Sequence, residues 1–388
     1  MRLQMRFPAG LSIALWCLPG MLAAQDVAIH NATHITIAKG DVLGNIVVRG
    51  GKMTAVGANV TISSGIKVID GTGKAFAQSA NSPFVVPAWA FPTSPAPNPA
   101  PKPDSVMLHH VPNTAREYTM RQVGNAFDIP DWFPASHTVM PAPVQYGTRP
   151  NARACGFCHL PDGQGRPENS ALAGLPVDYI VRQVRAFRDS TRLAANPASK
   201  TNSMHLIATS TSDADVAIAA KYFSRLRLTR RNIVREVAEV PKTHIELMLY
   251  AYDSSGTEPI DGRLIEVPES FERHELRDPT VVYTTYVAVG SIARGRRLAM
   301  NGPNGAATAC ATCHGPQLRG KDVVPPIAGR SPSNILRQLM NFRTGARHDS
   351  MSITMAPIVA KLSVRDMVSL SAYVGSRRPS APAAAKRR

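Results

Sequence analysis

Cysteine is scarce in this chain, and long apolar runs are few. The 388 residues include five cysteines, and Cys17 lies in a short apolar stretch near the N-terminus. The other four form two Cys-x-x-Cys pairs, so none remains for a disulfide framework or a separate cysteine nucleophile. A membrane-spanning helix needs about 20 consecutive apolar residues, and no run beyond the N-terminus approaches that length. The sequence therefore argues against a polytopic membrane protein and against a disulfide-stapled one.

Acidic residues are also few relative to basic ones. The chain has 44 Lys and Arg against 27 Asp and Glu, a net charge of +17. Such a surface attracts proteins with acidic docking surfaces and leaves association with an anionic membrane surface open. No helix-turn-helix, zinc-finger or RNA-binding signature accompanies the charge, so we predict no nucleic-acid partner. Apolar residues make up 44% of the chain, enough for folded cores.

The first 24 residues have the pattern of a secretory signal peptide. Arg2 and Arg6 precede the apolar stretch, and small residues precede Gln25. A buried N-terminal helix and a membrane anchor are the alternative interpretations. A signal peptide would export the protein to the periplasm, and its cleavage would remove Cys17.

Composition changes divide the rest of the chain. Residues 26–77 alternate apolar and polar residues as strands do, with a hairpin predicted at Gly50-Gly51. Eight prolines between 83 and 103 indicate a stiff, extended linker. The predicted segments are a signal peptide at 1–24, a small β-rich segment at 26–77, a Pro-rich linker at 78–106, a first repeat at 107–230, a β-patterned insertion at 231–290, a second repeat at 291–380 and a basic tail at 381–388.

The two repeats share one spacing of residues. Counted from the His that follows each Cys pair, a Gln recurs 24 residues on and a Phe 28 residues on. The matched pairs are Gln183 with Gln338, Phe187 with Phe342, Arg192 with Arg347, Met204 with Met355, Asp215 with Asp366, and Tyr222 with Tyr373. Helices are predicted at Asp178 to Arg188 and Ser333 to Arg343, and helix caps at Ser212 and Ser363. This periodicity indicates two copies of one helical fold.

The insertion has the composition of strands instead. The expected features are strands at Ile245 to Tyr252, Arg263 to Val267 and Thr280 to Val289, and a turn at Asp253 to Gly256.

Each repeat contains the sequence Cys-x-x-Cys-His, which attaches c-type haem. Two thiols at this spacing bond the two vinyl groups at one porphyrin edge, and the adjacent His binds the iron. A zinc site does not require a His after each pair, and a thioredoxin-like pair needs a βαβ context. We therefore predict two haem c groups. The predicted attachment residues are Cys155, Cys158, Cys310 and Cys313, and the predicted iron ligands are His159 and His314.

A sixth iron ligand would favour electron transfer over catalysis. Met204 and Met355 are the candidates, because both lie eight residues before the serine of a predicted helix cap. Filling a core is the ordinary role of a methionine. Met351 is the rival in the second repeat, and His205 is the rival in the first.

Other charged residues receive weaker assignments. Arg192 and Arg347 could pair with haem propionates or could be solvated charges at helix ends. Six histidines are expected at the surface, not at iron: His109, His110, His137, His244, His274 and His348.

These motifs and registers resemble those of class I cytochromes c, and the pair of repeats resembles the dihaem cytochrome c4 family. The resemblance covers about 150–380 without the insertion, which is longer than any in that family. It implies a mainly α fold of two tandem cytochrome c domains, with the β-patterned insertion between them and the small N-terminal β segment before them. It also implies His/Met ligation and periplasmic electron transfer. Residues 26–77 resemble the N-terminal strands of amidohydrolases, but no metal-binding His-x-His follows, so no hydrolase activity is carried over.

We therefore expect an electron carrier and not an enzyme. It would carry electrons from a dehydrogenase or a quinol-oxidising complex to a terminal acceptor. Two alternatives stay open. One is a dihaem peroxidase or haem oxidoreductase with an open iron, and the other is the cytochrome subunit of a dehydrogenase complex.

Overall fold

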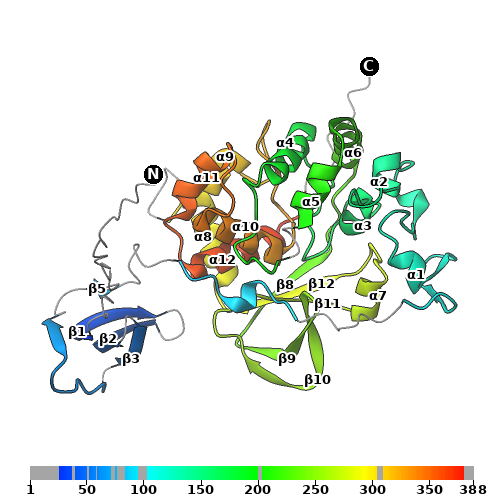
Figure 1. Ribbon diagram of the computed structural model, residues 1–388. Helices are drawn as coiled ribbons and strands as arrows, with labels where there is room; N and C mark the ends of the chain where they lie inside the picture. Colours follow the sequence, from blue (N-terminus) through cyan, green and yellow to red (C-terminus); the bar gives the residue numbers. More distant parts are fainter. Residues whose placement is uncertain are drawn as a thin grey trace, which may run out of the picture. The chain divides into compact units, whose positions relative to one another are not determined.

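The computed structural model describes residues 26–36, 40–49, 52–57, 59–70, 75–76, 84–94, 103–199, 203–303 and 309–379 (Figure 1). The chain divides into an N-terminal unit, Met1–Ser82, and a main unit, Pro83–Arg388. The predicted signal peptide and basic tail lie outside the described residues. Within the described residues, no helix has the length and apolar character of a membrane span.

The N-terminal unit is a small sheet. Its strands are β1 (Val27–Thr36), β2 (Gly40–Arg49), β3 (Lys52–Gly57), β4 (Lys67–Asp70) and β5 (Ala75–Phe76). They are ordered β3-β2-β1-β4, and β5 also pairs with β1. Arg49 lies opposite Lys52 in the antiparallel β2–β3 pair, the register of the predicted hairpin. This sheet contains none of the predicted haem-binding residues.

The two repeats in the main unit form matching sets of helices. The first contains α3 (Cys155–His159), α4 (Val177–Arg188), α5 (Ser203–Ser210) and α6 (Asp213–Arg225). The second contains α9 (Cys310–His314), α10 (Pro332–Thr344), α11 (Ser352–Val359) and α12 (Val364–Ser376). Ser212 and Ser363 cap α6 and α12, each accepting a hydrogen bond of 3.1 Å from the backbone N–H three residues on. The predicted helices and caps are confirmed.

The segments before the two haem motifs differ. In the second repeat, α8 (Ser291–Asn301) packs along α12. The first repeat has only short elements in this place: β6 (Leu108–His110), β7 (Glu117–Thr119), α1 (Met120–Val123), η2 (Pro134–Ser136) and α2 (Ala142–Gln145). Proline causes the difference, because it cannot donate a backbone hydrogen bond inside a helix.

The insertion folds into strands around one short helix. Its elements are β8 (Asn232–Val237), β9 (Glu239–Glu246), β10 (Leu249–Pro259), β11 (Ile265–Pro268), α7 (Phe271–Glu275) and β12 (Tyr283–Ala288). Strands β11, β12 and β8 form one sheet in that order, and β9 and β10 form a hairpin.

The prediction of a turn at Asp253 to Gly256 is wrong. Strand β10 runs through those residues with a register shift, and the chain reverses between Glu246 and Leu249 instead. A contact distant in sequence explains the reversal, because the carbonyl of Leu247 accepts a hydrogen bond from the backbone N–H of Ser94 at 2.8 Å.

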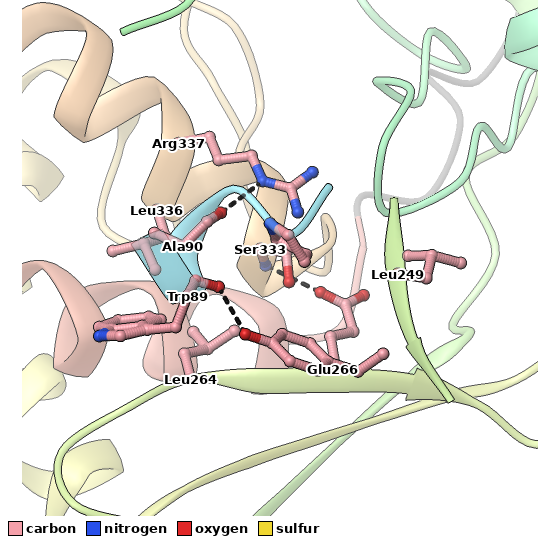
Figure 2. Close-up of a pocket in the computed structure, with 10 residues that line it drawn as sticks. Trp89, Ala90, Leu249, Leu264, Glu266, Ser333, Leu336 and Arg337 are labelled. Atoms are coloured by element: carbon pink, nitrogen blue, oxygen red, sulfur yellow. Dashed lines mark hydrogen bonds between the residues drawn. The ribbon is translucent and has the colours of Figure 1, made fainter. Parts of the chain in front are cut away.

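Part of the expected linker belongs to the folded core. Residues 84–94 include the short helix η1 (Ala88–Ala90), and Ala90 and Phe91 are buried. Figure 2 shows Arg337 of α10 donating to the carbonyl of Ala90, at 2.8 Å. The Tyr250 hydroxyl also donates to the carbonyl of Trp89, at 3.0 Å. The prediction of an extended linker is therefore wrong for these residues, since they pack against α10 and β10.

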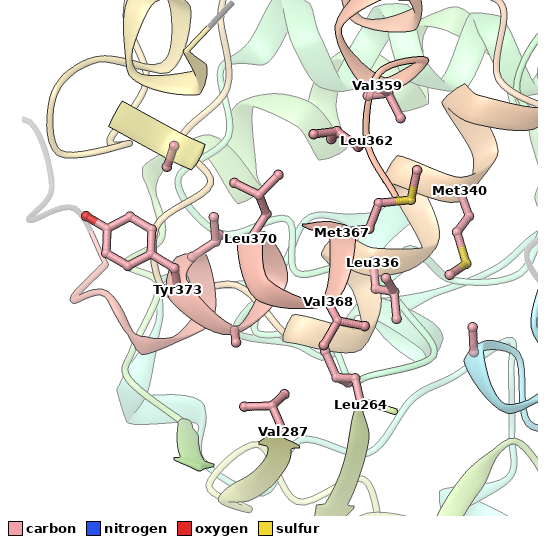
Figure 3. Close-up of a cluster of buried hydrophobic side chains, with 14 of the residues drawn as sticks. Leu264, Val287, Leu336, Met340, Val359, Leu362, Met367, Val368, Leu370 and Tyr373 are labelled. Carbon is pink, nitrogen blue, oxygen red and sulfur yellow. The ribbon is translucent and has the colours of Figure 1, made fainter. Parts of the chain in front are cut away.

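The largest hydrophobic core lies in the second repeat (Figure 3). It joins buried side chains of α10, α11 and α12 to residues of the insertion, among them Leu264, just before β11, and Val287 of β12. Helices α10, α11 and α12, the insertion and residues 84–94 therefore share one hydrophobic core. Because each part buries side chains of the others, we expect them to fold together.

Helices α8 and α12 cross at Gly295. A Cβ atom there would overlap the carbonyl oxygen of Ser369 on α12. We expect Gly295→Ala to lower the free energy of unfolding of the haem-loaded protein by about 2–3 kcal/mol, because an overpacked helix crossing must separate. Denaturant titration measures this change. Ala293→Ser, at an exposed position of the same helix, should leave stability within about 0.5 kcal/mol. Equal stability of the two variants would contradict this account of the crossing.

Candidate haem sites

The two Cys-x-x-Cys-His sequences form the short helices α3 and α9. In each helix the cysteines are the first and fourth residues and the histidine is the fifth. Residues three and four apart lie on one helix face, so both thiols and the imidazole of each motif face the same side. This is the arrangement that covalent attachment and iron ligation of one haem require.

Both imidazoles are oriented by a backbone carbonyl. Nδ1 of His159 lies 2.7 Å from the carbonyl oxygen of Ser170, and Nδ1 of His314 lies 2.9 Å from that of Pro325. Each acceptor is eleven residues beyond its histidine. When Nδ1 donates to a carbonyl, Nε2 carries the lone pair that binds a metal. The motif alone did not reveal Ser170 and Pro325, although their equal spacing was readable in the repeat.

The surroundings of the motifs keep these groups neutral. Burial lowers the pKa of His159 and of His314, and the nearby charge of Arg192 lowers that of His159 further. Burial also raises the pKa of Cys155 to about 12 and that of Cys310 to about 11. A neutral imidazole is the form that binds iron.

The four cysteines stay apart as two pairs. Within the described ranges, no three His, Cys, Asp or Glu side chains gather as a metal site would require. The zinc alternative, which would bring the two pairs together, therefore has no support in the fold.

Arg192 and Arg347 meet at the junction between the two repeats. Their backbones form an isolated antiparallel bridge, and the residues are only 8% and 5% exposed. The interpretation of these arginines as solvated charges at helix ends is therefore wrong.

The matched glutamines complete this junction. Gln183 Oε1 accepts from Arg192 Nη1 at 2.6 Å and from Arg347 Nη2 at 2.8 Å. Gln338 Oε1 accepts from Arg347 Nη1 at 2.9 Å and from Arg192 Nη2 at 3.2 Å. Four residues that occupy equivalent positions in the two repeats thus form one crossed hydrogen-bond cluster, which we call the Arg–Gln junction.

The Arg–Gln junction carries excess positive charge. Burial and the charge of Arg347 lower the pKa of Arg192 to about 10. Burial opposes ionisation of Tyr179, yet the charges of Arg347 and Arg192 lower its pKa to about 8. The carboxylate of Asp349, with Oδ2 3.2 Å from Arg347 Nε, is the acid that faces this pair.

Hydrogen-bond donors without a partner lie beside the charged Arg192 and Arg347. Nε2 of Gln183 and Nε of Arg182 are buried and have no hydrogen-bond partner in the part of the chain that the structure describes. Buried donors and uncompensated guanidinium groups fit an anionic acceptor such as a haem propionate.

The candidate sixth ligands lie on matched helices. Met204 is the second residue of α5, which packs on α4, and Met355 belongs to α11, which packs on α10. Both are half-buried, and Met355 packs against the core of the second repeat. Met351 is 37% exposed at the start of α11. His205, the rival in the first repeat, has Nδ1 2.9 Å from the carbonyl of Phe187.

Two of the histidines expected at the surface are buried. Only 3% of the side chain of His137, and 3% of that of His274, is exposed. His137 lies 3.0 Å from the Tyr222 hydroxyl and 3.3 Å from Asp131, and His274 lies 2.9 Å from the Tyr283 hydroxyl. The expectation is wrong for both, because contacts distant in sequence cover the loops that carry them. His110, His244 and His348 are exposed, as expected.

Comparison with known proteins places these motifs in a family. No protein-family model matches the chain. The chain is 28% identical over 229 residues to cytochrome c4 of Azotobacter vinelandii, covering 58% of this chain and 84% of that protein. It is 37% identical over 75 residues to cytochrome c-554(547) of Halothiobacillus neapolitanus, covering 17% of this chain and 82% of that protein. The chain belongs to the c-type cytochromes. It resembles the dihaem cytochromes c4 and carries two haem c groups.

Two further similarities concern parts of this cytochrome. It is 41% identical over 73 residues to the thiosulfate dehydrogenase electron acceptor of Stutzerimonas stutzeri, covering 18% of this chain and 32% of that protein. The solved cytochrome c4 of Pseudomonas stutzeri superposes with a TM-score of 0.38 at 23% identity, over 58% of this chain and 93% of that one.

The Arg–Gln junction should be essential to the stability of the cytochrome. We expect Arg347→Met to lower the free energy of unfolding by about 3 kcal/mol, because it leaves the buried Asp349 carboxylate without its counter-cation and removes one of the two donors to each glutamine. Thermal unfolding of the haem-loaded protein measures this loss. Arg185→Met, on α4 with a side chain that is 59% exposed and lies 3.8 Å from Asp213, is the matched control and should leave the melting temperature nearly unchanged. Equal melting temperatures for the two variants would show that the junction is dispensable.

Proposed function

We propose that this cytochrome is an exported, periplasmic electron carrier that works between a donor enzyme and a terminal acceptor. The observation that carries the proposal is the pairing of two equivalent haem-binding helices across one buried junction. Each helix has its own oriented histidine, and residues of both repeats meet between them. A protein with two such sites has the parts for passing electrons.

The residues of each proposed haem site have different roles in attaching the haem and binding its iron. Cys155 and Cys158 attach the first haem and Cys310 and Cys313 the second. Nε2 of His159 and of His314 would bind the iron, since Nδ1 of each ring is taken by a backbone carbonyl. When bound, each haem supplies an iron that changes between Fe(III) and Fe(II). The protein sets its potential through the axial ligands and the burial of the site.

Methionine is proposed as the second axial ligand in both repeats. Met355 is favoured over Met351, because Met355 is half-buried among core residues whereas Met351 is exposed. Met204 occupies the equivalent position in the first repeat. A thioether ligand favours Fe(II) and raises the potential relative to a second imidazole.

The Arg–Gln junction is proposed to hold haem propionates from both repeats. Its guanidinium groups outnumber its carboxylates, and carboxylates pair with guanidinium groups through charge-assisted hydrogen bonds. Propionates at this place would bring the two haems to the same interface and so support electron exchange between them.

The partners are proposed from chemistry and from relatives. The net charge of +17 favours redox proteins with acidic docking surfaces, and an anionic membrane surface would be attracted by the same charge. One relative carries the name of an electron acceptor of thiosulfate dehydrogenase, which supports a dehydrogenase as the class of donor. A quinol-oxidising complex is the other donor class, and a terminal oxidase fits as acceptor.

Replacing the proposed methionine ligand should change the second haem in a specific way. We expect Met355→Ala to remove half of the iron–sulfur charge-transfer absorption, to lower one of the two reduction potentials and to open that iron to carbon monoxide. Met351→Ala is the control and should leave all three properties unchanged. Visible spectroscopy and potentiometric titration measure them.

The same measurements test the function. Two low-spin haems per chain with two charge-transfer contributions support a carrier. A high-spin haem in the unmodified protein, together with peroxide turnover, would overturn this proposal in favour of an enzyme. Loss of the band on Met351→Ala instead would overturn the ligand assignment alone.

A further inference from the structure

The outer faces of the two haem-binding helices have different surroundings. The second and third residues of Cys-x-x-Cys-His lie on the face opposite the thiols and the imidazole. In α3 the third residue is Phe157, and the guanidinium group of Arg277 lies 3.7 Å from the centre of its ring. Arg277 also donates to the carbonyl of Phe157 at 2.6 Å and to that of Val123 at 3.0 Å. In α9 the equivalent residue, Thr312, is exposed.

A second contact covers α3 from the other side. Gly156 is buried, and a Cβ atom there would overlap the side chain of Ile129 and lie 3.0 Å from the carbonyl of Val144. The covering elements are tied together, because Trp132 Nε1 donates to the carbonyl of Leu276 at 2.8 Å. The segment before the motif and the insertion thus form one continuous cover over the first motif.

The residues after each motif show the same asymmetry. In the first repeat, Gln164 is 5% exposed and donates from Nε2 to the carbonyl of Arg227 at 2.7 Å. Arg166 lies 2.9 Å from Glu168, and its side chain is 10% exposed. Both Arg166 and Glu168 also approach His274 of the insertion, at 3.4 and 3.6 Å.

The equivalent positions of the second repeat are at the surface. Counted from the His of each motif, they are Arg319, Lys321 and Val323. Arg319 and Lys321 are exposed, and Val323 is 45% exposed. The backbone N–H of Gly320, between the two basic residues, donates to the carbonyl of His314 at 2.9 Å, which holds them beside the motif.

We propose that partner proteins exchange electrons with this cytochrome through the second repeat, at a surface formed by Thr312, Arg319, Lys321 and Val323. This surface, the α9 patch, docks an acidic redox protein. In the first repeat, the insertion and the segment before α3 cover the corresponding surface around Gly156 and Phe157. The proposal rests on the proposed function and adds to it the surface at which electrons enter or leave the protein.

The chemistry of the α9 patch identifies the class of partner. Thr312 and Val323 supply exposed small polar and apolar side chains, Arg319 and Lys321 supply two cations, and Asp322 adds one carboxylate. Opposite charges steer such partners together, and the apolar centre excludes water once they meet. In the exchange one electron passes from Fe(II) of the second repeat to a one-electron acceptor, which is reduced as the iron becomes Fe(III). No bond or proton changes place. The haem held by the first repeat would supply its electron to that of the second, and the Arg–Gln junction joins the two repeats.

Charge reversal on the patch tests this route. The probe is an oxidised acidic plastocyanin, a one-electron copper acceptor, mixed with the fully reduced cytochrome in a stopped-flow instrument at low ionic strength. We expect Arg319→Glu with Lys321→Glu to lower the second-order rate constant by about tenfold and to remove most of its salt dependence. The matched control is Lys221→Glu with Arg225→Glu, at exposed positions on α6 of the first repeat, and should change the rate less than about twofold.

A structural readout complements the rate. Carbodiimide cross-linking of the complex, followed by mass spectrometry, should join plastocyanin carboxylates to Lys321 and not to Lys221. Equal rate losses in the two double variants, or cross-links concentrated on Lys221, would overturn the proposal. Failure of the proposed function would show differently, as high-spin iron and peroxide turnover in the unmodified protein whatever the patch variants do.

Discussion

The buried meeting of Arg192 and Arg347 is the constraint on which the main unit depends. Two guanidinium groups so close together repel each other, and burial removes the water that would screen them. The structure offsets this cost with two glutamine acceptors shared crosswise and with Asp349. Because each arginine uses the glutamine of the other repeat, neither repeat satisfies its own polar groups alone. The two haem-binding helices are therefore held in one fixed arrangement.

The insertion makes two equivalent sites unequal. Both repeats orient the histidine proposed to bind iron in the same way. Around the first, however, Arg277 and His274 reach over the motif, while around the second no such cover is found among the described residues. A covered site and an exposed one differ in desolvation and in access, and both properties affect potential and partner choice. The two repeats thus share the same motif geometry but differ in how much of the motif their surroundings cover.

Local patterns predicted much of the fold. The spacing of apolar residues located α4 and α10, and the serine caps located the starts of α6 and α12, because helix periodicity and capping depend on neighbours within four residues. The same kind of reasoning failed where distant segments meet. Residues 84–94 have the composition of a linker, but in the structure they pack against α10. The turn before Leu249 depends on a hydrogen bond from the backbone N–H of Ser94. The sequence also suggested that His137 and His274 lie at the surface, because the distant segments that cover them cannot be identified from their neighbours in sequence.

The haem chemistry was determined by the sequence itself. Cys-x-x-Cys-His places its reactive groups within two turns of one helix, so five consecutive residues suffice to predict two haem c groups and their histidine ligands. The tertiary structure decided what surrounds them. Whether Arg192 lies in solvent or in a buried junction, and whether Phe157 is covered or Thr312 exposed, depends on contacts between residues more than 100 positions apart. Such contacts result from packing of the whole chain, which no local pattern encodes.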